Sequence, residues 1–233
     1  MRRILVLFAL LGLGGSLAVA APLCLNDGTY AFYEANYSTF SSACLIGDKL
    51  FWGFTLGTGP NSVGGEPKDT QIQVQTLPGD GFSNPGISFN SGGWTADPGF
   101  PIDAILSYNV ATQSGAPIIE DATLTITGTL TGTGASSNVK ETLTPAVPGS
   151  PLQVFLPGTS QHITFLANEQ SSFLVKNEIN VFVDPAFPAS NAHISVVENQ
   201  FSEDILIPEP MVTVLIGSGL LLFGIVRRKR VER

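Results

Sequence analysis

Between its two ends the chain consists of short apolar stretches rich in Val, Ile, Thr, Phe and Tyr, which Gly, Pro, Asn and Asp interrupt. Polar and apolar residues alternate most clearly at residues 71–75 (Gln-Ile-Gln-Val-Gln) and 123–127 (Thr-Leu-Thr-Ile-Thr). Successive side chains of a strand point to opposite faces, so this pattern predicts sheets with one buried and one solvated face. We find no helical periodicity in this interior. Residues 21–206 are therefore predicted to form one all-β domain, an antiparallel β-sandwich of the jelly-roll or Ig-like kind.

The breaks between the apolar stretches bound the expected strands. These cover residues 30–37, 50–56, 70–77, 102–111, 122–130, 152–156, 162–166, 172–183 and 192–201. A Thr-Gly repeat at residues 127–134 predicts a strand that runs into a hairpin tip, because glycine supplies the positive φ of such turns. Four prolines between residues 145 and 157 indicate loops around a short edge strand. A boundary between two smaller sandwiches is the alternative.

The charge of this interior is strongly one-sided. Residues 21–207 hold 17 acidic side chains against four lysines and no arginine, a net charge of −13. A protein that binds nucleic acid needs a basic surface to neutralise phosphates. We therefore exclude nucleic acid as a partner.

Residues 1–20 have the organisation of a secretory signal peptide. Arg2 and Arg3 precede an apolar run from Ile4 to Leu17, and residues 18–20 (Ala-Val-Ala) favour cleavage after Ala20. An uncleaved membrane anchor is the alternative, but the apolar run is short for a spanning helix. The pattern predicts export.

A second apolar segment, residues 211–226, is followed by a basic tail, residues 227–233. As a helix, sixteen residues cover ~24 Å, and snorkelling arginines extend that reach toward the ~30 Å hydrocarbon core. Basic residues stay on the cytoplasmic side of a membrane. We therefore expect one C-terminal transmembrane helix, with the acidic domain outside.

The tripeptide Pro208-Glu209-Pro210 directly precedes this segment. Its prolines fix φ and lack N–H donors, so it stays extended and does not join the following helix. Three parts thus follow one another: the tripeptide, the apolar segment and the basic residues Arg227, Arg228, Lys229 and Arg230. This arrangement resembles the PEP-CTERM sorting signal of Gram-negative bacteria. The family usually has Val where this chain has Ile207, a conservative difference. An ordinary stop-transfer anchor behind a Pro-rich linker is the alternative.

The resemblance covers residues 207–230 and implies a destination. Proteins with this signal are understood as substrates of an exosortase, and they are associated with exopolysaccharide or biofilm matrix. The same region is sometimes labelled an ice-binding-protein C-terminal domain, which implies nothing about ice here. The resemblance thus implies an exosortase and the inner membrane as partners before processing, followed by the cell surface or the extracellular space.

The chain has two cysteines, Cys24 and Cys44, both in the part predicted to be exported. An even count in an oxidising compartment favours a disulfide, and two unpaired buried thiols are the alternative. The spacing and the shortage of other ligands exclude a Cys-x-x-Cys redox pair and a zinc site.

Residues that could carry catalysis are sparse. The two histidines, His162 and His193, each lie in an expected strand, where a half-exposed structural role is commoner than a catalytic one. Gly-x-Ser-x-Gly and His-Glu-x-x-His motifs are both absent from the sequence. Adjacent carboxylates at residues 120–121 and 203–204 point to opposite faces of a strand. A glycosidase-like pair across strands stays open, but we expect no enzyme and no cofactor.

Aromatic side chains offer the clearest candidates for ligand binding. Trp52, Tyr30, Tyr33 and Tyr37 are weaker candidates for sugar contacts. Trp52 lies among phenylalanines, so we expect it in the core. Trp94 follows Ser-Gly-Gly and is expected in a flexible loop, where it would contact sugar. Asp97 and Asp103 lack the ligand density of an EF-hand loop, so we expect a solvated loop and no metal, with a calcium site at these two residues as the alternative. The sequence therefore predicts a non-catalytic structural or interaction protein of the cell envelope, with a lectin-like carbohydrate-binding module as the alternative.

Overall fold

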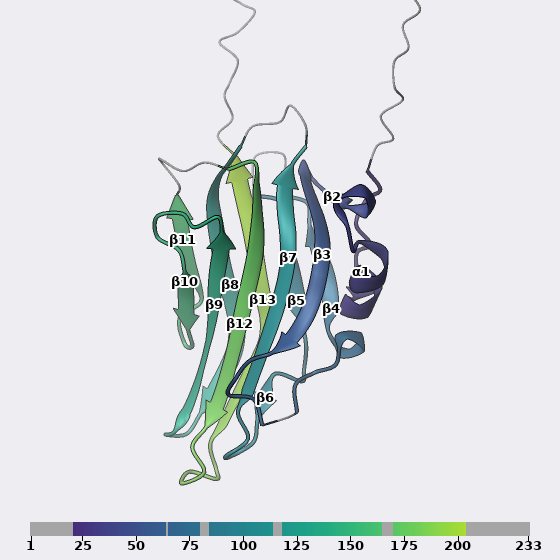
Figure 1. Ribbon diagram of the computed structural model, residues 1–233. Helices are drawn as coiled ribbons and strands as arrows, with labels where there is room; N and C mark the ends of the chain where they lie inside the picture. The colour runs from purple at the N-terminus through teal and green to yellow at the C-terminus, as the bar shows by residue number, and fades with distance from the viewer. Residues whose placement is uncertain (1–20, 64, 80–83, 114–117, 165–169, 204–233) are drawn as a thin grey trace, which may run out of the picture.

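The computed structural model describes residues 21–63, 65–79, 84–113, 118–164 and 170–203. These residues form two antiparallel sheets that pack face to face (Figure 1). One sheet has the strand order β10 (Leu152–Phe155), β9 (Ala135–Thr144), β12 (Ser172–Val183), β7 (Ile102–Thr112), β3 (Lys49–Thr58) and β2 (Cys44–Ile46). We call it the β12 sheet.

The second sheet, the β13 sheet, is built around the long strand β13 (Asn191–Glu203). Its strand order is β1 (Gly28–Thr29), β4 (Gln73–Leu77), β5 (Gly86–Asn90), β13, β8 (Ile119–Thr131) and β11 (Ser160–Thr164), and β6 (Thr95–Ala96) also pairs with β13. Three short helical segments complete the described part of the chain: α1 (Tyr30–Asn36), η1 (Phe40–Ser42) and η2 (Asp69–Gln71). The predicted all-β class is confirmed.

Alternation along the strands produces a single core between the sheets. On β8, Leu124 and Ile126 are fully buried, while Thr123, Thr125 and Thr127 face outward. Ile72 and Val74 alternate with exposed glutamines in the same way. The buried apolar residues of both sheets belong to one contiguous cluster, so the described residues form one sandwich and not two smaller ones.

The segment expected as a strand at residues 30–37 is instead the helix α1, so that prediction was wrong. The Thr29 hydroxyl caps the helix by accepting a hydrogen bond from the N–H of Phe32 at 3.2 Å. Tyr30, Tyr33 and Tyr37 are buried, and their spacing of three and four residues places them on one helical face. The strand propensity of tyrosine concealed this periodicity.

The Thr-Gly repeat also behaves differently from the prediction. β8 and β9 belong to different sheets, so residues 132–134 carry the chain across the sandwich and do not form a hairpin. Gly132 and Gly134 have φ values of +79° and +104°, which fits the expected need for glycine there. The proline-flanked strand β10 lies at the edge of its sheet, as predicted.

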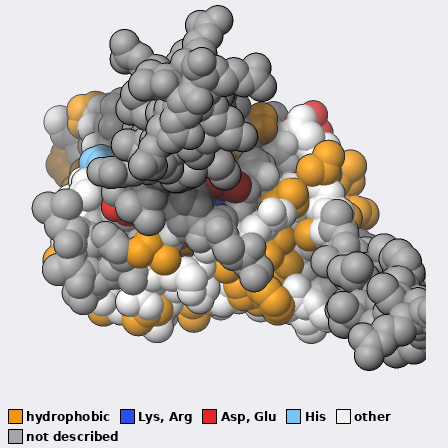
Figure 2. Space-filling view, turned by 90° about the horizontal axis from the view of Figure 1, so that it is seen from above, with side chains coloured by type: hydrophobic (Ala, Val, Ile, Leu, Met, Phe, Trp, Pro, Cys, Tyr) orange, Lys and Arg blue, Asp and Glu red, His pale blue; other side chains and the backbone are white. Residues whose placement is uncertain are grey.

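Both ends of the described chain lie at the same end of the sandwich, at the top of Figure 1. There Leu23 bridges to Leu45, and Glu203 pairs with Ile119 at the start of β8. Among the side chains in view from above, hydrophobic and uncharged groups predominate (Figure 2). We call the opposite end, with the loops at residues 97–101, 132–134 and 184–190, the distal end.

Candidate functional site

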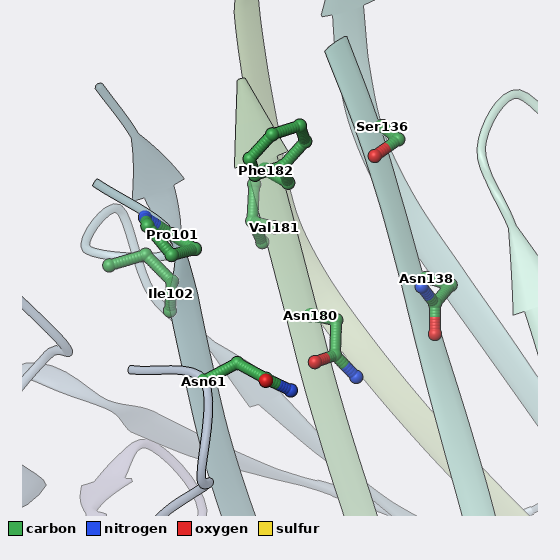
Figure 3. A pocket seen from close by; sticks show the side chains of 8 residues that line it. All are labelled: Asn61, Pro101, Ile102, Ser136, Asn138, Asn180, Val181 and Phe182. Carbon is green, nitrogen blue, oxygen red and sulfur yellow. The ribbon is translucent and has the colours of Figure 1, made fainter. Parts of the chain in front are cut away.

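A pocket of about 430 Å³ opens on the outer face of the β12 sheet, at the distal end (Figure 3). This volume falls within the ~300–1,000 Å³ typical of small-ligand sites. No charged side chain lines the pocket. Its lining residues are Asn61, Pro101, Ile102, Ser136, Asn138, Asn180, Val181 and Phe182.

The register of the sheet places the polar members of this pocket side by side. Asn180 of β12 is directly opposite Asn138 of β9 on one side and Asp103 of β7 on the other. Phe182 is opposite Ser136, two residues further along the same strands. Cross-strand partners point to the same face with their Cβ atoms about 5 Å apart. The amides of Asn138 and Asn180, the hydroxyl of Ser136 and the phenyl ring of Phe182 therefore lie next to one another on the outer face of the sheet.

Asp103 fixes the loop that carries Asn61 over the sheet. Its side chain is fully buried, and its Oδ2 accepts a hydrogen bond from the backbone N–H of Asn61 at 2.9 Å. The loop passes so close that a Cβ added to Gly59 would lie 1.8 Å from Asp103 Oδ1. Asp103 thus positions Asn61, and glycine is required at residue 59 for this close approach.

Backbone hydrogen bonds tie the distal loops together. The N–H of Gly99 donates to the carbonyl of Val183, and the N–H of Asp184 donates to that of Gly134, each at 2.9 Å. Phe100 and Phe187 are exposed on these loops. The pocket therefore lies beside loops that backbone hydrogen bonds hold together and that expose two phenylalanines.

A second polar group lies inside the sandwich. Glu141 of β9, Asn177 of β12 and Asn199 of β13 are fully buried between the sheets. Asn177 Nδ2 donates to Asn199 Oδ1 at 2.7 Å, and Asn199 Nδ2 donates to Glu141 Oε2. Among the described residues, Glu141 Oε1 and the hydroxyl of Tyr108 have no hydrogen-bond partner.

Burial raises the pKa of Glu141 to about 8, although the hydrogen bond from Asn199 opposes this shift. The carboxyl is therefore mostly protonated at neutral pH. Enclosed between two sheets, this cluster connects β9, β12 and β13 and is out of reach of substrate. The sequence carried a signal for it, since Glu141 occupies the inward phase of β9 between Val139 and Leu143.

The prediction that Trp94 forms an exposed sugar contact was wrong. Its side chain is 0% exposed and belongs to the core, and the backbone carbonyl of the same residue accepts a hydrogen bond from the N–H of Ile194 at 3.0 Å. The Gly-Gly sequence before it allows the chain to turn inward: a Cβ on Gly93 would lie 2.7 Å from Pro67 Cβ. Gly93 thus serves close packing against Pro67, and the two glycines before Trp94 do not mark a flexible loop.

The tyrosines considered as weaker sugar contacts are also buried. The Tyr30 hydroxyl donates to the carbonyls of Thr55 and Ser107 at 2.9 and 3.0 Å, and that of Tyr33 donates to the carbonyl of Leu25 at 2.6 Å. Burial raises the pKa of both hydroxyls above the usual range. Trp52 is half-buried on the outer face, and its ring meets Phe40 edge-on with centroids 5.0 Å apart. It does not belong to the core.

The two histidines lie in strands, as expected, and each contacts a threonine. His162 of β11 is 2.8 Å from Thr123 Oγ1 through Nδ1, and its Nε2 is 3.9 Å from Asp121 Oδ2. His193 of β13 is 2.9 Å from Thr95 Oγ1 through Nδ1. Asp97 is exposed, whereas Asp103 is buried. Within the described ranges, three or more His, Cys, Asp or Glu side chains nowhere converge in a way that could hold a metal ion.

The predicted disulfide is confirmed. Cys24 and Cys44 are bonded, with their Cα atoms 4.7 Å apart and a separation of 20 residues along the chain. Leu45 lies beside Leu23 through a parallel bridge, which places the two cysteines next to each other. The bond fixes the start of the described chain to β2.

The predicted signal peptide (residues 1–20) and sorting signal (Pro208, Glu209, Pro210 and residues 211–233) lie outside the described residues. In the part that is described, no helix is long and apolar enough to cross a membrane. No protein-family model matches the chain, and a comparison with curated proteins finds no match. The resemblance of residues 207–230 to a PEP-CTERM signal remains a prediction from the sequence.

Proposed function

We propose that this chain is an exported, non-catalytic protein of the bacterial cell envelope, sorted by an exosortase through residues 207–230. The observation that carries the proposal is the Cys24–Cys44 disulfide, four residues after the expected cleavage site. Disulfides persist in oxidising compartments and are rare in the cytosol. A bond at this position agrees with removal of residues 1–20 and with folding outside the cytosol.

The position of the chain ends supports a tether at one end of the sandwich. Both ends of the described chain lie at the end of the sandwich opposite the pocket (Figure 1). A single C-terminal span at residues 211–226 would hold that end near the inner membrane and direct the distal end outward. After processing, the same arrangement would present the distal end at the cell surface or to exopolysaccharide.

A structural or interaction role fits the chemistry of the described residues. A catalytic site needs converging polar groups in contact with solvent. Here Glu141, the carboxyl whose pKa burial raises to about 8, is enclosed in the core, while the polar groups that line the open pocket are three amides and a hydroxyl. The jelly-roll or Ig-like assignment remains part of this proposal.

Processing in a Gram-negative host that encodes an exosortase tests the sorting proposal. Intact-mass analysis of surface material should find a chain that begins at Ala21 and lacks the basic tail. Pro208→Ala combined with Glu209→Ala should accumulate in the membrane fraction with its tail. Ile207→Val, which restores the residue usual in the family, is the matched control and should be sorted normally.

Any of three results would refute sorting by this route. One is surface material that retains Met1 and residues 227–233. The others are normal processing of the Pro208→Ala, Glu209→Ala variant, and normal processing of the unaltered chain in the same host without its exosortase.

A carbohydrate-binding module is the second candidate function. With Trp94 buried, the observation that favours it is the uncharged pocket on the β12 sheet. This function is compatible with sorting to the envelope and can be tested separately.

A further inference from the structure

We propose that the pocket formed by Asn61, Ser136, Asn138, Asn180 and Phe182 binds a neutral polysaccharide. The inference deepens the carbohydrate-binding candidate and rests on it, but it does not depend on sorting by an exosortase. Five properties of the pocket support it: its hydrogen-bonding groups, its exposed rings, its uncharged lining, its preorganisation and its position.

The hydrogen-bonding groups match sugar hydroxyls. An amide side chain both donates and accepts, and a hydroxyl does the same, so a saccharide can satisfy either role at each contact. Within the described residues, the side chains of Asn61, Asn180 and Ser136 form no hydrogen bond with protein. Asn138 Oδ1 accepts a hydrogen bond from Gln153 Nε2 at 3.2 Å, which leaves its own amide donors to the pocket.

The exposed rings provide apolar surface for the C–H faces of sugar rings. Phe182 is 41% exposed and lies at the edge of the pocket. Phe155 of β10 is 57% exposed and stands directly opposite Asn138 in the register of the sheet. Phenyl rings with polar neighbours on one face combine apolar contact with orienting hydrogen bonds, as small-ligand sites do.

The charges around the pocket favour a neutral ligand over an anionic one. The lining contains no lysine, and residues 21–207 contain no arginine that could pair with a carboxylate or phosphate. Asp103, beside Asn180 in register, is an acidic and not a basic residue, and residues 21–207 carry a net charge of −13. An anionic polymer would be repelled at close range, whereas a neutral one would not.

The site is also held in place before any ligand arrives. Asn138 and Asn180 lie on adjacent central strands, and Asp103 fixes the backbone of Asn61. A preorganised site binds with a smaller entropic cost than one that must first order its loops. Its distal position leaves it open to a polymer when the other end is tethered.

A retention assay tests the inference. The full-length protein, purified in detergent, is applied to a panel of neutral and anionic polysaccharides. We expect retention on at least one neutral polysaccharide. Asn180→Ala and Phe182→Ala should each weaken that binding about tenfold or more, the effect of losing ~1.4 kcal/mol of contact. Both residues lie on the outer face of β12, so the melting temperature should change little; Asn180→Asp is a second variant that conserves size.

Leu174→Ala is the matched control. Leu174 lies on the same face of the same strand, with an exposed fraction of 42% against 41% for Phe182, but at the other end of β12. This variant should bind as the unaltered protein does.

The outcomes separate the inference from the function on which it rests. Failure of the unaltered protein to bind any neutral polysaccharide overturns both. Retention that Asn180→Ala and Phe182→Ala leave unchanged keeps the carbohydrate-binding function but overturns this site. Retention on anionic polysaccharides alone overturns the neutral specificity.

Discussion

Replacing Glu141 with glutamine should change how the stability of the protein depends on pH. Burial raises the pKa of the Glu141 carboxyl from 4.5 to about 8 in the folded protein. Between these two values the folded state keeps a proton that the unfolded chain releases. The protein is therefore most stable, with respect to this group, below about pH 4.5, and that contribution is lost as the pH rises toward 8.

The size of the effect follows from the two pKa values. A difference of about 3.5 between 8 and 4.5, at ~1.36 kcal/mol for each pKa unit, gives about 5 kcal/mol once the pH exceeds 8. Glutamine has nearly the same shape, does not titrate and can still accept the hydrogen bond from Asn199. The free energy of unfolding of Glu141→Gln, relative to that of the unaltered protein, should therefore increase by about 4 kcal/mol from pH 4.5 to 8 and approach about 5 kcal/mol at higher pH.

Urea unfolding followed by tryptophan fluorescence measures this difference, with the disulfide kept intact. The Tyr108 hydroxyl, which the Glu141 charge also affects, stays neutral over the range because burial raises its pKa. Leu174→Ala on the outer face of β12 changes no titratable group, so it is the control and should keep the pH dependence of the unaltered protein. If the difference between Glu141→Gln and the unaltered protein is constant from pH 4.5 to 8, the carboxyl is not protonated in the fold and the reasoning fails.

Two further predictions concern the covalent and backbone constraints of the fold. Thiol labelling of denatured, unreduced protein should find no free cysteine, and two labels per chain would contradict the bond. Replacing Cys24 and Cys44 with serine should lower the free energy of unfolding by ~3 kcal/mol. Gly53→Ala should lower stability by about 1–3 kcal/mol in urea unfolding, because Gly53 has a φ of +68° and an added Cβ would lie 2.5 Å from Asn109 Nδ2. Gly57→Ala on the same strand, with no atom closer than 3.8 Å to the added Cβ, should change stability little; equal losses in both variants would refute the steric argument.

Alternation in the sequence predicted most long strands because a half-buried sheet imposes it directly. The prediction for residues 172–183 coincides with β12, and those for 102–111 and 122–130 fall within β7 and β8. β9 was missed because its inward positions include a serine and a glutamate, which weaken the apolar pattern. Helix α1 was missed because tyrosine favours strands, although its residues repeat with helical spacing.

The candidate site could not be predicted from local sequence. Asn61, Asn138 and Asn180 lie on three separate segments, and only the register of β7, β9 and β12 brings them together. Trp94 was the better candidate by local composition, but it is fully buried, and the preceding Gly93 lies close to Pro67, a residue far from it in sequence. The disulfide was predictable because two cysteines allow only one pairing within a chain.

The length of the sandwich determines what the proposed site would encounter. β13 has thirteen residues, and at ~3.3 Å per residue it spans about 40 Å from the distal end to the end where residue 203 lies. Residues 204–210 can add at most ~25 Å before the expected span begins. The length of the sandwich alone exceeds the Debye length of ~8 Å at physiological ionic strength several times, so the surface charge of a membrane would not act on a ligand in the pocket. Binding at the distal end would then depend on contacts within the pocket alone, and these are uncharged, which favours the same neutral ligand before and after release from the membrane.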